Sequence, residues 1–185
     1  MSAVDPLTRL ALQARAGDAD ALGGFVETGY EQVWRFCATL VGRQEADDAS
    51  QETFVRAVRS LPQFRGESSA QTWLLAIARH VCIDELRTRA RRRRRDTALG
   101  SSQERSDADA GAGITAADLI GRLDHDRRAA FVLTQVLGLS YAEAARVCEC
   151  PPGTIRSRVA RARADLISFL ARPERDGRQG RSSSA

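Results

Sequence analysis

The sequence predicts an all-α protein with two small helical domains joined by a flexible linker. Apolar residues recur three and four positions apart, as on one face of a helix, and no stretch alternates apolar and polar residues as a strand does. Aromatic residues make up only 5% of the chain and hydrophobic residues 43%, so the cores consist mainly of Ala, Leu and Val, which favours helices. Residues 96–114 and 173–185 lack this periodicity and are rich in small and polar residues, which predicts a flexible linker and a disordered tail.

Four helices are predicted in the first domain, which covers residues 5–95. The first two span residues 7–16 and 21–41, and Pro62 stops the third because proline cannot continue a helix. A capping box of the form Ser-x-x-Gln begins the fourth helix, which spans at least residues 68–89. The apolar stripes of the last three helices are formed by Phe25, Val33, Phe36, Cys37, Leu40, Phe54, Val55, Val58, Leu61, Leu74, Ala78, Val81, Cys82 and Leu86.

The second domain, residues 115–172, is predicted to contain a helix-turn-helix. It opens with the capping signal Thr-x-x-Asp, and a helix over residues 126–137 ends at a glycine. A Ser-x-x-Glu box then begins a short helix over residues 140–148, and Pro-Pro-Gly at residues 151–153 forms a turn. A final helix covers residues 154–170. A short helix, a tight turn and a longer basic helix form the arrangement that places a recognition helix in the DNA major groove.

Charged residues are segregated along the chain. Residues 1–67 contain ten acidic residues and seven arginines, whereas residues 68–95 contain eight arginines and two acidic residues. Residues 96–121 are acidic again with a single arginine, and residues 122–172 contain nine arginines and five acidic residues. A basic surface is therefore built twice, once in each half of the chain.

The final helix has the composition of a DNA-recognition helix. Its apolar stripe, from Ile155 to Phe169, packs the domain, and the remaining positions of its first half carry arginine and serine with no acidic residue before Asp165. Arginine can bind guanine in a bidentate manner or bind phosphate, and the positive end of a helix favours the anionic backbone. The alternative is a solvated basic face on an ordinary surface helix. The candidate DNA-binding residues here are Thr154, Arg156, Ser157, Arg158, Arg161 and Arg163.

Residues 137–145 (LGLSYAEAA) and 152–163 (PGTIRSRVARAR) closely resemble region four of sigma factors. This resemblance implies binding to the promoter −35 element, with Arg156, Ser157 and Arg161 as the foremost base or phosphate readers. A helix-turn-helix alone would not distinguish a sigma factor from a repressor.

Residues 45–54 (EADDASQETF) resemble the helix of sigma region two that binds core polymerase. By this resemblance a polar face of the helix docks on the coiled coil of the largest polymerase subunit. Its acceptor groups fall within about a turn and a half of helix and suit a basic partner. The alternative is that the acidic residues merely favour the positive end of their own helix. The candidate polymerase-binding residues are Asp47, Asp48, Gln51 and Glu52.

Residues 64–79 (FRGESSAQTWLLAIAR) resemble the segment of sigma region two that recognises and melts the −10 element. Opening a duplex requires a surface that pockets or stacks on an unpaired base while arginines hold the single strand. Trp73 has two interpretations, as a core residue or as part of that surface, and the seven arginines within residues 87–95 have two, as phosphate contacts or as a disordered basic run. The candidate −10 residues are Phe64, Arg65, Gly66, Glu67, Ser68, Trp73, Arg79, Asp84 and Arg87.

Both resemblances occur in the correct order, so the chain resembles the extracytoplasmic-function group of sigma-70 family sigma factors. This implies a protein that binds core RNA polymerase through the largest-subunit coiled coil and the flap, directs initiation at −10 and −35 elements and aids melting. The implied partners are core polymerase, promoter DNA and, by family habit, an anti-sigma factor. A stand-alone helix-turn-helix regulator is the chief alternative, and a nucleic-acid enzyme is a more remote one.

No catalytic or cofactor-binding pattern accompanies these motifs. The four cysteines, Cys37, Cys82, Cys148 and Cys150, lack the spacing of a zinc site, and no nucleophile–base pair or phosphate-binding glycine loop occurs. We therefore expect no enzyme activity, no metal and no cofactor. No apolar run reaches the roughly 18 residues that span a bilayer, and the first 17 residues lack the order of a signal peptide, which predicts a cytoplasmic protein without membrane contacts.

Overall fold

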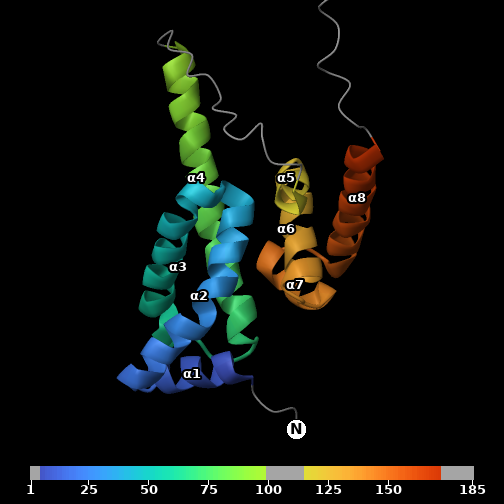
Figure 1. Cartoon of the computed structure of the whole chain (residues 1–185). Coiled ribbons are helices and arrows are strands. Elements are labelled where there is room, and N and C mark those ends of the chain that lie inside the picture. Colours follow the sequence, from blue (N-terminus) through green and yellow to red (C-terminus); the bar gives the residue numbers. More distant parts are fainter. Residues whose placement is uncertain (1–4, 99–114, 172–185) are drawn as a thin grey trace, which may run out of the picture.

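The computed structural model describes residues 5–98 and 115–171, and every regular element in those ranges is helical (Figure 1). The predicted fold class is confirmed. The predicted tail and most of the predicted linker, residues 99–114, lie outside the described residues. The first group of helices comprises α1 (Pro6–Arg15), α2 (Ala19–Val41), η1 (Arg43–Glu45), α3 (Ala46–Ser60), η2 (Leu61–Gln63) and α4 (Ala70–Ala98).

Helices α2, α3 and α4 pack side by side, and α1 crosses one end of the group (Figure 1). Carboxylates cap the first two helices: Asp5 accepts from the Thr8 amide at 2.9 Å and Asp18 accepts from the Ala21 amide at 2.9 Å. The buried residues of these three helices and of η2 include the predicted stripe positions Phe25, Val33, Phe36, Cys37, Leu40, Phe54, Leu61, Leu74, Ala78, Val81 and Cys82.

The N-cap of α4 lies one residue later than predicted, and the helix begins at Ala70. The hydroxyl of Ser69, not that of Ser68, accepts from the Thr72 amide at 3.2 Å. A second cap comes from α1, because the Thr8 hydroxyl accepts from the Ala70 amide at 2.7 Å. A local capping motif cannot include this long-range contact, which fixes where α4 starts.

The arginine run continues α4 as helix to Ala98, three residues beyond the predicted domain end. The arginines at positions 87 and 91–95 are exposed. Arg89 is half-buried, donating to Glu85 at 2.8 Å and to the Val41 carbonyl at 3.0 Å. This end of α4 projects past α2 and α3 (Figure 1).

The second group comprises α5, α6, a π-helical turn η3, α7 and α8. Capping boxes join Thr115 to Asp118 and Ser140 to Glu143, as predicted. Gly138 has φ of 73° and follows η3, so a glycine is favoured there. The last helix starts two residues earlier than predicted, with proline in its first turn. The bounds are α5 (Ala116–Gly121), α6 (His125–Phe131), η3 (Val132–Val136), α7 (Tyr141–Cys148) and α8 (Pro152–Ala171).

The two groups of helices contact each other. Helix α7 packs against α4, while α5, α6 and η3 lie against α2, so that the buried apolar residues of both groups form one continuous cluster. Two residues of the predicted stripe of α3 are left outside this core, with Val55 42% and Val58 39% exposed. No described helix is long and apolar enough to cross a membrane.

The Thr8 hydroxyl joins α1 to α4, and its loss should destabilise the fold. In Thr8→Val the side chain keeps its shape, but the buried Ala70 amide loses its acceptor. We expect the free energy of unfolding in urea to fall by about 1–3 kcal/mol. Thr88→Val is the matched control, because the Thr88 hydroxyl donates to the Asp84 carbonyl one turn earlier in an exposed setting. Equal losses in both variants would contradict this role of Thr8.

Candidate functional site

The first half of α8 presents a basic surface to solvent. Ile155, Val159 and Ala162 are buried and fix the helix against its domain. The opposite side exposes Arg156 and Arg161, together with the predicted Ser157 and Arg163, while Thr154 is half-buried. The Ser157 hydroxyl donates to the Thr154 carbonyl at 2.9 Å, and Arg163 donates to Gln135 at 2.6 Å. This surface suits the phosphates and base edges of a duplex groove.

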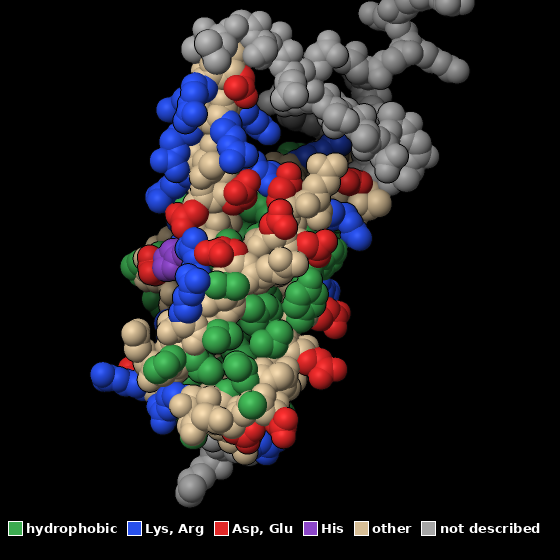
Figure 2. All heavy atoms as spheres, turned by 90° about the vertical axis from the view of Figure 1, so that its left-hand side faces the viewer, with side chains coloured by type: hydrophobic (Ala, Val, Ile, Leu, Met, Phe, Trp, Pro, Cys, Tyr) green, Lys and Arg blue, Asp and Glu red, His purple; other side chains and the backbone are tan. Residues whose placement is uncertain are grey.

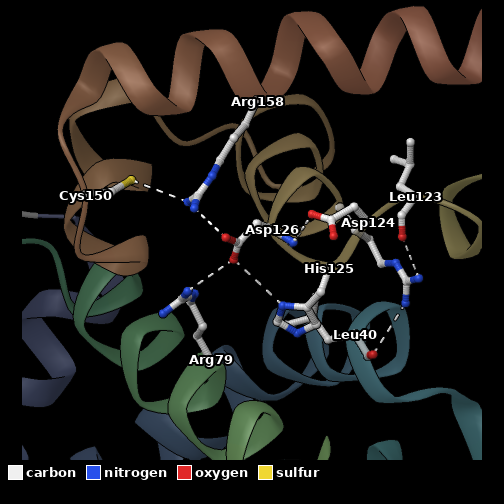
Figure 3. Close-up of polar contacts among 9 residues, drawn as sticks. Leu40, Arg79, Leu123, Asp124, His125, Asp126, Cys150 and Arg158 are labelled. Atoms are coloured by element: carbon white, nitrogen blue, oxygen red, sulfur yellow. Dashed lines mark hydrogen bonds and ion pairs between the residues drawn. The ribbon is translucent and has the colours of Figure 1, made fainter.

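Arg158 lies apart from the other predicted readers on α8. Its guanidinium pairs with the Asp126 carboxylate and contacts the Cys150 sulfur at 3.6 Å, and its side chain is 22% exposed (Figure 3). The Arg158 side chain therefore points inward, toward the first turn of α6.

The loop before α4 encloses a small hollow of about 190 Å³, lined by residues 63–68 and Trp73. Phe64 is buried, with its ring centroid 4.8 Å from that of Trp73, and Arg15 donates to the Phe64 carbonyl at 2.8 Å. Gly66 has φ of 73°, a conformation that glycine adopts without strain. The flanking predicted residues Arg65 and Glu67 are exposed and Ser68 is half-buried. An aromatic wall beside a polar, open hollow can receive an unpaired base.

Trp73 lies between the core and this hollow. Its ring packs against the core at a centroid distance of 6.4 Å from Phe25, and the same side chain lines the hollow.

The predicted −10 residues on α4 occupy different surroundings. Arg87 is exposed, and Asp84 accepts from Arg56 at 3.0 Å. The Arg79 side chain is 11% exposed, because the second group of helices covers it, and it pairs with Asp126 at 3.6 Å. The structure therefore leaves the loop and Arg87 open and covers Arg79.

The predicted polymerase-binding residues lie on the outer side of α3. Asp47, Asp48 and Gln51 are exposed, and Asp47 accepts from the Trp34 indole at 2.7 Å. Glu52 is half-buried and accepts from Arg56 at 2.7 Å.

An apolar groove continues this side of α3. The exposed Val55 and Val58 follow Asp48 and Gln51 at helical spacing, and with Tyr30 of α2 they line a groove of about 560 Å³. Figure 2 shows hydrophobic side chains gathered on this side of the molecule, away from the arginine-covered end of α4. Sequence reasoning assigned both valines to the apolar stripe and missed this groove. The three- and four-residue spacing from Asp48 was the signal that could have found it.

Asp126 of α6 joins Arg79, Arg158 and His125 at the contact between the two groups (Figure 3). Nearby, Arg128 donates to the Thr39 carbonyl of α2 at 3.3 Å. Sequence reasoning missed this cluster, because its members come from helices far apart in the chain.

Burial lowers the pKa of His125, and the nearby Arg128 and Arg79 act in the same direction, against Asp126 and Asp124. The neutral imidazole is therefore the form that the folded protein favours. Around the cluster, two further contacts cross between the groups: His80 with Glu149 at 3.2 Å, and Gln71 with the Leu137 carbonyl at 3.4 Å.

Comparisons with known proteins agree with this architecture. Residues 25–92 match the family model Sigma-70 region 2, and residues 115–166 match the model Sigma-70, region 4. The chain is 47% identical over 169 residues to a probable RNA polymerase sigma-C factor of Mycobacterium bovis, covering 89% of this chain and 91% of that protein. It is 32% identical over 188 residues to an ECF RNA polymerase sigma-E factor of Haemophilus influenzae, covering 91% and 98%.

Two solved structures share the fold across both groups of helices. CnrH, solved in complex with the cytosolic domain of CnrY, has a TM-score of 0.69 and 27% identity, covering 90% of this chain and 98% of that one. The sigma factor RpoE of Bartonella quintana, solved with the anti-sigma factor NepR, has a TM-score of 0.68 and 29% identity, covering 79% and 94%.

The fold and its basic surfaces define a two-domain helix-turn-helix protein that binds DNA. The chain belongs to the sigma-70 family of RNA polymerase sigma factors, in its extracytoplasmic-function (ECF) group. This family consists of transcription initiation factors, which favours the sigma factor over a stand-alone helix-turn-helix regulator.

The lowered pKa of His125 predicts that acid weakens the folded state. The unfolded chain binds a proton at His125 with a pKa of about 6.5, whereas the folded chain does so only at lower pH. Its contribution to stability is therefore complete above the unfolded pKa and is lost as pH falls below it. We expect His125→Gln to flatten the decline of the free energy of unfolding between pH 7 and pH 5, measured in urea. Parallel declines in the two proteins would contradict the assignment.

Proposed function

We propose that this chain binds core RNA polymerase through α3, reads the −10 element with the loop before α4 and reads the −35 element with α8. The observation that carries the proposal is the separation of these surfaces. Helix α3 lies at one side of the molecule and α8 at the other (Figure 1). The exposed side of α3 is acidic and apolar, as a basic protein partner requires, and the exposed side of α8 is basic, as DNA requires. The domains of this division are residues 5–95 and 115–172, joined by residues 96–114.

The polymerase-binding surface combines Asp48 and Gln51 with the groove at Val55 and Val58. Exposed carboxylate and amide groups provide acceptors for arginine or lysine on a partner, and the groove offers apolar area beside them. A coiled coil of the largest polymerase subunit, with basic side chains flanking an apolar ridge, would match both features. This surface is larger than the polar set inferred from sequence, because it includes the two exposed valines.

The −10 surface is formed by the loop at residues 64–68, the Trp73 ring and the arginines of α4. The hollow captures one unpaired base against the aromatic side chains, and Arg87 with the run that follows holds the strand through its phosphates. Capture of a base outside the stack favours the open duplex over the closed one. This chain therefore assists melting by binding its product and needs no chemistry of its own.

The −35 surface is the exposed side of α8, where Arg156, Ser157 and Arg161 enter the major groove. Each domain alone offers a small contact area. Polymerase holds the two readers at a fixed separation, which raises the effective concentration of the second once the first has bound. Promoter selection is thus a property of the holoenzyme.

The remaining assignments follow from this role. The second domain contacts the polymerase flap, an anti-sigma factor is a further partner, and the protein works in the cytoplasm because polymerase and promoter DNA are there. The solved relative RpoE, bound to the anti-sigma factor NepR, supports that partner class. The chain acts without enzyme activity, metal or cofactor, since polymerase supplies the chemistry. A holoenzyme reconstituted from core polymerase and this chain should initiate at defined sites of a promoter library, and its failure to do so would refute the proposal.

Arg156→Ala tests the −35 assignment. Loss of a bidentate base contact should weaken −35-dependent initiation by about 1–3 kcal/mol and relax discrimination at one base position. Core-polymerase affinity should stay unchanged. Arg122→Ala, an exposed arginine of the same domain outside α8, is the matched control. Run-off transcription from promoters with an intact or scrambled −35 element measures the effect, and equal loss on both templates would show a structural role instead.

Asp48→Arg tests the polymerase-binding surface. Reversing this charge should weaken core-polymerase binding by at least about tenfold, because it places a cation against a basic partner. Asp20→Arg makes the same charge change on an exposed residue at the far end of α2 and should bind normally. Fluorescence anisotropy of labelled chain titrated with core polymerase measures both. Normal binding by Asp48→Arg would remove α3 from the interface.

A further inference from the structure

One face of α1 lies along the loop before α4. Thr8, Leu12 and Arg15 are spaced four and three positions apart, so their side chains project from the same side of the helix. Helix α1 crosses the end of the bundle where the loop lies (Figure 1), and it contacts both η2 and α4, the elements that flank the loop. The part of the chain that matches the Sigma-70 region 2 model begins at residue 25, so that match assigns no role to α1.

Arg15 holds the first residue of the loop. Its guanidinium donates to the Phe64 carbonyl at 2.8 Å. Phe64 is only 4% exposed, so a carbonyl at this position that lacked a donor would destabilise the loop through its lost hydration. Among the described residues Arg15 forms no ion pair, and its one side-chain hydrogen bond is the contact with the loop. The guanidinium is therefore committed to Phe64 and not to a neighbouring carboxylate.

Thr8 and Leu12 contact the rest of the loop. The Thr8 hydroxyl donates to the Asp5 carboxylate at 2.6 Å, which leaves its lone pairs to accept from the Ala70 amide at 2.7 Å, where the loop joins α4. Between the two ends Leu12 lies against Gly66, because a Cβ at Gly66 would be 3.6 and 3.8 Å from the Leu12 methyl groups. The start, the middle and the end of the loop are therefore each in contact with α1.

The loop has few internal contacts that could fix its shape. Residues 65–68 make no backbone–backbone hydrogen bond with any described residue. Arg65 and Glu67 approach to 4.0 Å, but their side chains are 81% and 80% exposed, and an exposed pair of this kind contributes little to stability. The contacts with α1 therefore determine where the loop lies relative to the Trp73 ring, which lines the hollow with it.

We propose that α1 holds the loop before α4 in the shape that captures an unpaired −10 base, with Arg15 as the principal positioning residue. Arg15 acts through the Phe64 carbonyl and does not touch the base. This role of α1 rests on the proposed function, since the hollow receives a base only if the loop reads the −10 element. A site for one base tolerates displacements of only about 0.5 Å. A loop released from α1 would adopt other shapes for part of the time, and its affinity for the base would fall in proportion.

Arg15→Met tests this role, because methionine keeps an unbranched apolar side chain and removes every donor. The probe is the single-stranded non-template −10 segment of a promoter that the parent holoenzyme selects, with an abasic site at each position in turn. In the parent, an abasic site at the captured position should weaken holoenzyme binding on the order of tenfold, because one base–aromatic stack is lost. In Arg15→Met this penalty should fall to about twofold or less, because the base is then seldom captured. The penalties at the other positions should stay as in the parent.

Arg9→Met is the matched control for the loss of charge. Arg9 is exposed on the same helix, and its side chain forms no hydrogen bond or ion pair with a described residue, so the variant should keep the parent's penalty at the captured position. Arg15→Lys should restore the penalty, because the Phe64 carbonyl needs one donor and an ammonium group can supply it. The role of Arg15 is overturned if Arg15→Met keeps the parent's penalty, if it loses affinity equally on every oligonucleotide, or if Arg15→Lys restores nothing.

Leu12→Ala removes the contact at the middle of the loop without changing a charge. It should reduce the penalty at the same position, and circular dichroism with urea unfolding shows whether each variant is folded. If Arg15→Met does not fold, an unchanged penalty in folded Leu12→Ala overturns the role of α1. The parent holoenzyme tests the proposed function separately. A parent with no position sensitive to an abasic site refutes the −10 assignment of the loop and the role of α1 with it, whereas a sensitive position that Arg15→Met leaves unchanged refutes only the role of α1.

Discussion

The burial of the N-terminal half of α4 is the constraint on which the rest of the structure depends. Leu74 and Leu75 are fully buried, and the amide at the start of the helix is capped from α1 by Thr8. Gly29 of α2 allows the close approach, because a Cβ there would lie 3.0 Å from a methyl group of Leu74. The helix is thereby fixed as one continuous support for the loop before it. Its covered side carries Arg79, and its free end, which carries the exposed arginine run, projects past α2 and α3 (Figure 1).

The same packing explains how a small chain presents unlike surfaces. Helix α3 covers one side of α4 with its apolar residues and turns Asp48, Val55 and Val58 outward. With Tyr30 these valines form a contiguous apolar patch beside acidic residues, which is typical of a surface that a partner covers. Helix α8 lies on the opposite side of the molecule from α3 (Figure 1). On the proposed assignment of α3 and α8, polymerase and the −35 duplex occupy opposite sides of the molecule and can be bound together.

Local sequence signals predicted the helices well and the contacts between them poorly. The capping boxes at Thr115 and Ser140 were identified because all their atoms lie within four residues. The start of α4 was placed one residue early, because the cap from Thr8 comes from another helix. The inward turn of Arg158 was not predicted for the same reason: Asp126 lies 32 positions away in the sequence. Helical periodicity also cannot say whether a valine such as Val58 faces the core or a partner.

The guanidinium group through which arginine binds DNA also binds the protein's own carboxylates. A guanidinium binds phosphate and carboxylate with the same planar set of donors. Which of the two an arginine binds therefore depends on whether each anion can reach the side chain and on how many anions surround it. Arg156 and Arg161 are exposed, whereas Arg79 is covered by the second group of helices and pairs with Asp126. Exposure therefore separates the arginines that are open to DNA from those, such as Arg79 and Arg158, that already pair with Asp126.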